Sequence, residues 1–209
     1  MKLHDLRKQY KLHTLDEVST PADPLEMFRL WFKQALSVHP YEANAFTLST
    51  VQDNRPSARV VLLKEFNSQG FVFFTNYKSR KARALEVNAY AAMNFYWPDM
   101  ERQIRIEGRV ERTTKEVSAA YFFQRPLESR INAVISPQSS KISSKDHLIL
   151  QHNQMLEQQM EPDLPGYWGG YVVVADYYEF WQGGPNRLHD RIIYEKSETG
   201  NWLKGRLAP

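Results

Sequence analysis

The sequence predicts a mixed fold, a closed or partly closed β-barrel with flanking helices. β-Prone runs fill residues 45–112, helical patterns fill about 114–160, and β-prone runs return from 167 onwards. Strands at both ends of the chain can pair with each other, so the last strands should pair back on the first ones. With 209 residues, 42% of them hydrophobic, we expect a single domain over 21–209. The polar residues 1–20 lack a clear period, which favours a mobile or ligand-ordered arm.

The first firm element is a helix that begins at Pro24, with Asp23 as its N-cap and apolar residues at helical spacing through Leu36. A short helix is expected later at 79–88, and further helices at 114–125, 126–135 and 145–160. The strands predicted from β-prone runs between turn-rich segments are 45–51, 57–66, 71–76, 90–97, 102–112, 167–184, 190–196 and 201–207. The first three of these strands should form an antiparallel meander.

Composition excludes several classes of protein. The 27 lysines and arginines exceed the 24 acidic residues by only three, an excess too small to require nucleic acid. The absence of cysteine excludes disulfides and thiolate chemistry, and the six histidines lack metal-ligand spacing, so we expect no metal. No signal-peptide core or membrane-spanning stretch is present, which favours a cytoplasmic protein without a membrane partner. G-x-S-x-G, P-loop and G-x-G-x-x-G motifs are absent.

Arg187, His189 and Arg191 are spaced two residues apart after a Gly-Gly-Pro break. Since side chains alternate along a strand, a turn that leads into a strand would place all three on one cationic face. Neighbouring like charges repel unless water or an anion lies against them. The face is therefore either solvated or bound to a negatively charged ligand.

Three further groups of residues have the side chains of an anion site. Arg59 and Lys64 flank an apolar run, Val60 to Leu63, that predicts a strand buried on both faces. Ser79 is a suitable N-cap that would place Arg80 and Lys81 in the first turn of a helix, where a phosphate would offset their conflict with the helix dipole. Tyr121, Arg125 and Ser129 recur every four residues, and Gln138, Ser139 and Ser140 follow in a polar loop. For each group, an ordinary solvated surface is the alternative.

Together these segments resemble one family. The motifs that carry the resemblance are RVVLLK, FFTNYKSRKA, RQIRIEG, YFFQRPLESRI, PQSSKIS, WGGY, FWQGGPNRLHDR and the terminal RLAP. In order and content they closely resemble the pyridoxamine 5′-phosphate oxidases, flavin mononucleotide (FMN) enzymes, from about Arg7 to Pro209. The resemblance implies an FMN-binding split β-barrel that forms a homodimer with FMN at the subunit interface.

The resemblance also implies the role of each matching residue. Those that would contact FMN are Arg59, Val60, Val61, Leu62, Leu63, Lys64, Phe74, Thr75, Arg80, Lys81, Gln103, Gln138, Ser139, Trp181 and Arg191. Those that would bind the substrate phosphate are Lys64, Tyr121, Arg125 and Ser129. Arg187 and His189 would be catalytic and lie over the substrate ring, and the arm residues Arg7, Lys8, Gln9 and Tyr10 would cover the substrate.

The implied reaction is the oxidation of pyridoxamine 5′-phosphate and pyridoxine 5′-phosphate to pyridoxal 5′-phosphate, with O2 as acceptor, hydrogen peroxide as product and ammonia released from the amine. Two positions depart from the family pattern: Phe74 lacks the hydroxyl of a tyrosine found in some members, and Asn132 replaces a usual glycine. Three other functions remain open: a flavin reductase of the same fold, a non-catalytic pyridoxal phosphate carrier, and a nucleic-acid-binding barrel, which the even charge balance disfavours.

Overall fold

The computed structural model describes residues 3–4 and 8–209. Its helices are α1 (Pro24–Val38), α2 (Arg80–Val87), α3 (Lys115–Gln124), α4 (Leu127–Ile135) and α5 (Lys145–Glu157), with short 3-10 turns at Pro98–Met100 and Pro185–Arg187. Its strands are β1 (Ala45–Gln52), β2 (Arg55–Leu62), β3 (Glu65–Asn67), β4 (Gly70–Asn76), β5 (Tyr90–Trp97), β6 (Arg102–Arg112), β7 (Trp168–Gln182), β8 (Asp190–Lys196) and β9 (Trp202–Arg206).

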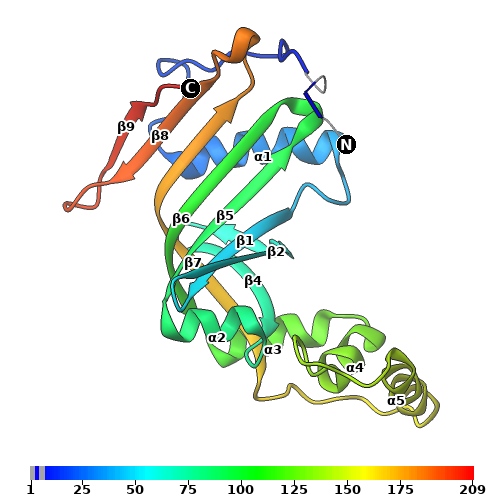
Figure 1. The fold of residues 1–209 in the computed structure, drawn as a ribbon. Coiled ribbons are helices and arrows are strands. Elements are labelled where there is room, and N and C mark those ends of the chain that lie inside the picture. The colour runs from blue at the N-terminus through cyan, green and yellow to red at the C-terminus, as the bar shows by residue number, and fades with distance from the viewer. Residues whose placement is uncertain (1–2, 5–7) are drawn as a thin grey trace.

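The strands form one antiparallel sheet that is strongly curved and does not close (Figure 1). Its order is β2-β1-β5-β6-β7-β4-β3, with β8 on β7 and β9 on β8. The prediction of a partly closed barrel with flanking helices is confirmed, and β7 pairs back on β4 as expected. The single meander is wrong, because β2 and β3 lie at opposite ends of the strand order. The predicted strand 57–66 is broken after Leu62, where Leu63 turns into the core.

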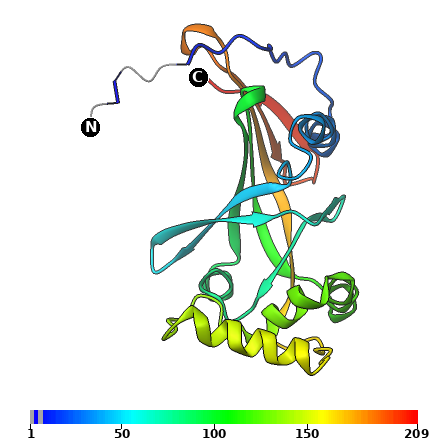
Figure 2. The ribbon, with the colours of Figure 1, turned by 90° about the vertical axis from the view of Figure 1, so that its right-hand side faces the viewer.

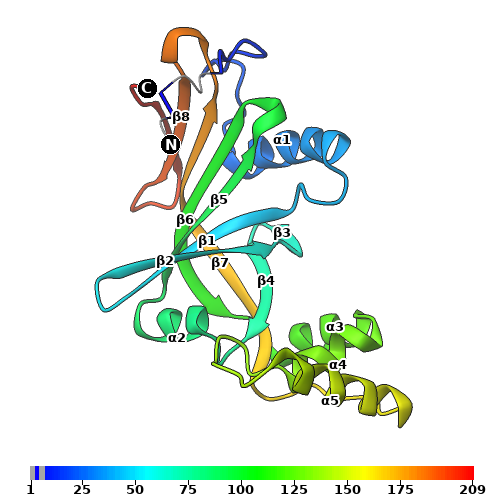
Figure 3. The same ribbon diagram turned by 45° about the vertical axis from the view of Figure 1, so that its right-hand side comes forward.

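The two longest strands, β6 and β7, determine the shape of the molecule. They run side by side from Arg102↔Gln182 to Arg112↔Tyr171, with a bulge at Glu107/Gly108. A Cβ at Gly108 would lie 2.1 Å from the Val174 carbonyl oxygen, so only glycine permits this close approach. Helices α3, α4 and α5 lie at one end of this pair, and β8 and β9 lie at the other (Figures 1 and 3).

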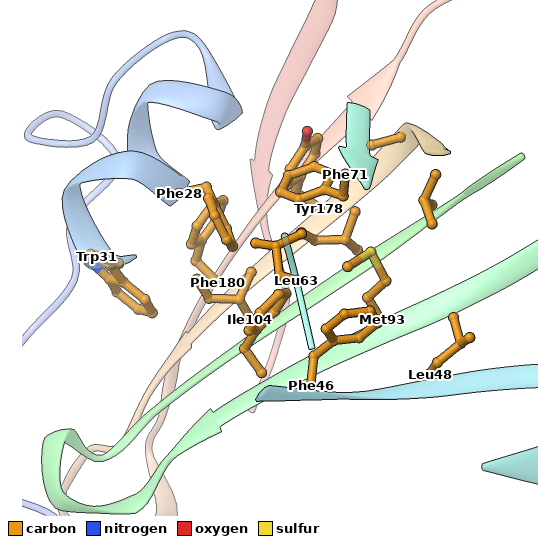
Figure 4. Close-up of a cluster of buried hydrophobic side chains, with 14 of the residues drawn as sticks. Phe28, Trp31, Phe46, Leu48, Leu63, Phe71, Met93, Ile104, Tyr178 and Phe180 are labelled. Atoms are coloured by element: carbon orange, nitrogen blue, oxygen red, sulfur yellow. The ribbon is translucent and has the colours of Figure 1, made fainter. Parts of the chain in front are cut away.

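The core is an aromatic cluster between α1 and the concave side of the sheet (Figure 4). Asp23 caps α1 by accepting a hydrogen bond from the Leu25 backbone N–H, as predicted. The fully buried Phe28 on this helix contacts Phe66, Phe71 and Phe95 with ring centroids 4.9, 4.9 and 5.3 Å away. These edge-on contacts fix α1 against the sheet.

The N-terminal segment follows the end of the molecule where β8 and β9 lie (Figure 2). The Leu15 backbone N–H donates to Asp190, and the Lys204 ammonium donates to the Glu17 and Thr20 carbonyl oxygens. Arg206 forms ion pairs with both Glu17 and Asp190. Residues 15–20 are thereby tied to the C-terminal strands.

Two predictions about side-chain faces are wrong. Arg187 and His189 do not share a strand face with Arg191, because β8 begins only at Asp190. A 3-10 turn precedes it, with Asn186 and Arg187 in the left-handed region at φ 54° and 65°. The run Val60–Leu63 is not buried on both faces either, since β2 is an edge strand and Val60 and Leu62 are 70% and 43% exposed.

The aromatic core makes a direct prediction for stability. Phe28→Ala should lower the free energy of unfolding by about 3–5 kcal/mol, because it leaves a cavity among fully packed rings. Leu30→Ala on the same helix is the matched control: Leu30 is 51% exposed, and a loss of no more than about 0.5 kcal/mol is expected. Urea unfolding at one protein concentration measures both, and equal losses would contradict the assignment of Phe28 to the core.

Candidate active site

A cavity with a volume of about 610 Å³ lies between the β2 edge strand, β4, and helices α2 to α4. Its lining includes the predicted site residues Val60, Val61, Leu62, Lys64, Phe74, Thr75, Lys81, Tyr121, Arg125, Ser129 and Gln138. We call these residues the cavity cluster. Three of them carry positive charge, and none of the described lining residues is an aspartate or glutamate. The cavity is therefore suited to a ligand with negative charge.

Three stacked aromatic rings form one wall of the cavity. The ring centroids of Phe74 and Tyr121 are 4.1 Å apart, and Trp168 lies 5.6 Å from Phe74 in nearly the same plane orientation. The guanidinium of Arg125 is 4.9 Å from the Trp168 ring, and the Lys64 ammonium is 5.8 Å from the Tyr121 ring. These rings give the cations an apolar support that leaves their N–H groups free to bind an anion.

The break between α3 and α4 brings Tyr121, Arg125 and Ser129 to the same cavity. Helix α3 ends at Gln124, Arg125 is extended, and Pro126 is the N-cap of α4, so two separate helices are observed as predicted. The Nη1 atom of Arg125 is buried and has no hydrogen-bond partner among the described residues. Burial lowers the pKa of this guanidinium. An unpaired buried donor is costly, and a phosphate oxygen would satisfy it.

The third cation of the cavity, Lys81, lies in the first turn of α2. Ser79 caps the helix as predicted and accepts a hydrogen bond from the Ala82 backbone N–H. The Lys81 ammonium lies 3.0 Å from the Thr75 hydroxyl and 3.3 Å from the Gln138 side-chain oxygen. Burial, together with the charge of Arg59, lowers the pKa of Lys81 to about 8. A third partner is the Ser79 hydroxyl at 3.4 Å, and since all three partners are neutral, the charge of Lys81 is uncompensated.

The remaining predicted residues of this region lie around the cavity. Arg59 on β2 donates to the Leu48 carbonyl and to the hydroxyls of Thr50 and Ser57. Burial and the charge of Arg80 lower the pKa of Arg59. Arg80 itself lines a smaller neighbouring pocket with Thr50 and Ser57.

Two residues that were predicted to contact FMN, Leu63 and Ser139, are not among the residues that line the cavity. Leu63 is buried in the core rather than exposed to the cavity, and its backbone N–H and C=O are both paired with Asn44. Ser139 follows Gln138 in a left-handed conformation, with φ 69°. A contact of Leu63 with a ligand in the cavity would therefore need a different local arrangement.

A second group of predicted residues lies at the other end of the sheet. Gln103, Trp181 and Arg191 are directly opposite one another on β6, β7 and β8. The His189 ring lies 4.8 Å from the Trp181 ring, and Tyr10 of the arm contacts both at 5.5–5.6 Å. We call this group, with the exposed Arg187, the distal cluster. Of the other arm residues, Lys8 pairs with Glu101, Gln9 is exposed, and Arg7 lies outside the described residues.

Glu179 orients Arg191 within the distal cluster. This carboxylate is 2% exposed and accepts hydrogen bonds from Arg191 Nε at 2.8 Å and Arg105 Nη1 at 3.0 Å. The hydrogen bond to Glu179 raises the pKa of Arg191. The Arg191 Nη1 atom donates to the Ala208 carbonyl, so the C-terminus also fixes this side chain.

The two clusters are far apart within one chain. Trp168 in the cavity wall and Trp181 in the distal cluster are both on β7, 13 positions apart (181 minus 168). At about 3.3 Å per residue this strand segment extends roughly 40 Å, which exceeds the reach of a mononucleotide. The structure therefore brings the predicted residues together as two groups rather than one.

Several residues of these sites were not predicted from the sequence. Trp168 and Ser136 line the cavity, and Glu179 and Glu101 support the distal cluster. The position of Glu179 two residues before Trp181 places both on one face of a strand, which is a signal that could have identified it. Asn132, the departure from the family pattern, lies at the cavity wall and hydrogen-bonds His152.

Comparison with models of known protein families assigns the chain to one of them. Residues 32–158 match the family model of pyridoxamine 5′-phosphate oxidase, and residues 168–209 match the pyridoxine 5′-phosphate oxidase C-terminal dimerisation region. The chain belongs to the pyridoxine/pyridoxamine 5′-phosphate oxidase family. It is thus an oxidoreductase, and the resemblance inferred from its motifs is confirmed.

Curated family members match it over nearly their whole length. The pyridoxine/pyridoxamine 5′-phosphate oxidase of Burkholderia ambifaria is 49% identical and covers 99% of both chains. The protein of the same name from Methylibium petroleiphilum is 48% identical over 98% of this chain and 97% of its own. That of Leptospira interrogans is 45% identical over 100% and 99%.

Solved structures support the fold. PhzG from Burkholderia lata, determined with tetrahydrophenazine-1-carboxylic acid, has a TM-score of 0.90 at 24% identity and covers 97% of this chain and 100% of its own. A pyridoxamine 5′-phosphate oxidase-related FMN-binding protein from Nostoc punctiforme has a TM-score of 0.72 at 16% identity, covering 91% and 100%. Within the described residues, no helix is both long and apolar enough to cross a membrane.

If the cavity binds the FMN that the family resemblance implies, the lowered pKa of Lys81 predicts a pH-dependent affinity for it. The free ammonium loses its proton as the pH rises through about 8, whereas a bound phosphate would keep it protonated. The dissociation constant of FMN should therefore rise about tenfold between pH 7 and pH 9. Quenching of flavin fluorescence on binding measures it.

Two variants serve as controls for this effect. Lys81→Arg keeps its charge over the whole range and should bind FMN with a nearly constant affinity between pH 7 and pH 9. Lys81→Gln should bind weakly at every pH without the inflection near pH 8. The same inflection in Lys81→Gln as in the unchanged protein would assign it to another group.

Proposed function

We propose that this protein binds FMN and oxidises pyridoxamine 5′-phosphate and pyridoxine 5′-phosphate to pyridoxal 5′-phosphate, with O2 as the electron acceptor. Hydrogen peroxide is the second product, and the amine substrate also yields ammonia. The observation that carries the proposal is the cavity with three cations and no described acidic lining residue, in a chain of the oxidase family. Two separate groups of cationic and hydroxyl side chains in it match two phosphorylated ligands.

The residues around Lys81 fit the FMN phosphate. Lys81, Thr75 and Gln138 lie within hydrogen-bond distance of one another. Besides burial, the charge of Arg59 lowers the pKa of Lys81, and the charge of Arg80 lowers the pKa of Arg59, so these three cations lie close together. Positive charges gathered with neutral partners are stabilised when an anion joins them. The exposed Val60 and Leu62 give an apolar strand edge against which a flat ring can lie.

The residues around Arg125 fit the phosphate of the substrate. The unpaired Nη1 atom of Arg125 supplies a donor, Lys64 adds a positive charge, and the hydroxyls of Tyr121 and Ser129 supply two further polar groups at the same cavity wall. Binding the phosphate here fixes one end of the substrate. Its reactive 4′ carbon can then be held at a constant position by the rest of the site.

When bound, FMN supplies the two-electron acceptor that no side chain of this protein provides. The substrate loses a hydride equivalent from its 4′ carbon and a proton from its amine or hydroxyl group. For the amine, water then hydrolyses the imine to the aldehyde and ammonia. O2 takes up the two electrons and two protons, which gives hydrogen peroxide and completes the balance.

Arg187 and His189 would act on the substrate ring and its protons. The His189 Nδ1 atom accepts a hydrogen bond from the Gly184 backbone N–H at 3.1 Å, so the neutral ring carries its proton on Nε2. This orientation leaves Nε2–H to donate to a substrate oxygen. Arg187 is held in a left-handed turn that projects it from the sheet, with its side chain exposed. Its charge would attract an electron-rich phenolate on the substrate.

The separation of the two clusters favours a homodimer with FMN at the subunit interface. A site that needs both clusters is incomplete within one chain, because β7 separates them by roughly 40 Å. In a symmetric dimer, the distal cluster of one copy can face the cavity of the other, which completes two equivalent sites. The match of 168–209 to a dimerisation region supports this arrangement.

The anaerobic visible spectrum of the FMN-loaded protein tests the proposed activity. Addition of pyridoxamine 5′-phosphate without oxygen should bleach the flavin absorption band, and air should restore it with formation of hydrogen peroxide. A flavin band that persists at saturating substrate would contradict the oxidase function and favour a flavoprotein with another reductant.

Arg125 is the residue whose loss should weaken substrate binding most directly. Arg125→Ala removes a charge-assisted hydrogen bond and should raise the KM for pyridoxamine 5′-phosphate roughly ten- to a hundredfold. Arg29→Ala, which removes an exposed guanidinium on α1, is the matched control and should leave KM unchanged. Steady-state oxidation measures both, and a normal KM in Arg125→Ala would remove this residue from the phosphate site.

A further inference from the structure

Glu101 connects the N-terminal arm with the turn that carries the candidate catalytic residues. Its side-chain Oε2 atom accepts hydrogen bonds from the backbone N–H groups of Lys11 at 2.8 Å and Leu12 at 3.1 Å. Its backbone oxygen accepts the Gly183 N–H at 2.8 Å and the Gln182 amide at 3.2 Å. One residue therefore holds two segments that are about ninety and eighty positions away in sequence.

The carboxylate of Glu101 is unusually well buried for a residue at a turn. It is 3% exposed, and its second oxygen pairs with the Lys8 ammonium at 3.4 Å. Burial alone would raise the pKa of this carboxyl, but the hydrogen bonds from Leu12 and Lys11 and the ion pair with Lys8 bring it below its ordinary value. The hydrogen bonds and the ion pair described for its side chain are all with the arm, and beyond these its charge acts on the neighbouring Tyr96 phenol.

The contacts of Glu101 place Tyr10 on the distal cluster. Tyr10 immediately precedes Lys11 and Leu12, whose backbone N–H groups donate to the Glu101 carboxylate. The centroid of its ring lies 5.5 Å from that of Trp181 and 5.6 Å from that of His189, in edge-on contacts. A Cβ at Gly183 would lie 2.7 Å from the Tyr10 ring, so the absence of a side chain at this position makes room for the ring. The arm and the turn are thus shaped to fit each other.

We propose that Glu101 is a positioning residue whose carboxylate keeps the N-terminal arm docked, with Tyr10 against the turn Gly183–His189. The arm must leave for substrate to enter and must dock again to cover it. Glu101 sets the fraction of molecules in which the arm is docked. Only molecules with a docked arm hold the substrate fully, so the apparent affinity for substrate falls as the docked fraction falls. A change that weakens the contact between Glu101 and the arm therefore raises KM, although the groups that bind the phosphate are unchanged.

The effect on KM rests on the proposed oxidase function, whereas the docking of the arm does not. Two readouts of the FMN-loaded protein therefore separate them. The first is hydrogen exchange at the backbone amides of Lys11 and Leu12, together with trypsin cleavage after Lys8 and Lys11. The second is steady-state oxidation of pyridoxamine 5′-phosphate, with FMN affinity and thermal unfolding measured on the same samples.

Glu101→Gln is the principal variant, because it keeps the size of the side chain and removes its charge. Hydrogen exchange at the arm amides and trypsin cleavage of the arm should both become about tenfold faster, because the glutamine side chain accepts weaker hydrogen bonds than the carboxylate does. KM should rise by the ratio of the docked fraction in the unchanged protein to that in the variant, while FMN affinity and the unfolding temperature stay near those of the unchanged protein. Glu111→Gln, on the strand β6 that begins immediately after Glu101, removes an exposed carboxylate and is the matched control, with no change expected.

Lys8→Ala provides a second variant that cannot fail through the core, because Lys8 is exposed. It removes the ion pair with Glu101, the hydrogen bond to the Pro98 carbonyl and the cation contact with the Tyr10 ring, but leaves both backbone hydrogen bonds to the Glu101 carboxylate. A smaller increase in arm exchange and in KM is therefore expected than for Glu101→Gln. Unchanged exchange in both variants would overturn the proposal that Glu101 keeps the arm docked. Faster exchange with an unchanged KM would overturn the role of Glu101 in positioning the arm for substrate binding. If the unchanged protein does not oxidise the substrate, the proposed function fails, and the exchange data still decide whether Glu101 holds the arm.

Discussion

Uncompensated positive charge in one cavity is the constraint on which the rest of this structure depends. Lys64, Lys81 and Arg125 share the cavity with no acidic residue among its described lining, and burial lowers the pKa of the last two. Such an arrangement opposes folding unless an anion offsets it. Arg191 in the distal cluster differs from these cations, because Glu179 neutralises its charge within the protein. The proposed phosphorylated ligands would offset the free cationic groups of the cavity and so stabilise the folded protein on binding.

The long antiparallel strands explain why the chemistry is divided between two ends. β6 and β7 must be long to carry the cavity wall at one end and the Trp181–His189 pair at the other, and the bulge at Gly108 allows them to curve between these ends. A sheet of this length cannot bring both ends to one small ligand in the same copy. In the proposed homodimer a second copy would supply the missing half, which would make dimerisation a requirement for the site rather than an addition to it.

Local patterns predicted most of the elements but not their long-range contacts. The strands at 90–97 and 102–112 match the prediction residue by residue, because alternation and turn residues are local signals. The shared face of Arg187, His189 and Arg191 was wrong, because the left-handed backbone of Asn186 and Arg187 interrupts the period. The residues around Trp168 and Glu101 could not be predicted, since their roles arise only when distant segments meet. The separation into two clusters likewise required the strand order.

The central claim is that each active site combines the cavity of one copy with the distal cluster of another, and mixed dimers test it most directly. Arg125→Ala removes a cavity residue and His189→Ala removes a distal one, so each variant alone should be strongly impaired. After subunit exchange, each mixed dimer should regain one intact site, which restores about a quarter of full activity. A control mixture of Arg125→Ala with Lys64→Ala, both in the cavity, should regain nothing. Activity in the first mixture no higher than the mean of the two variants would contradict a shared site.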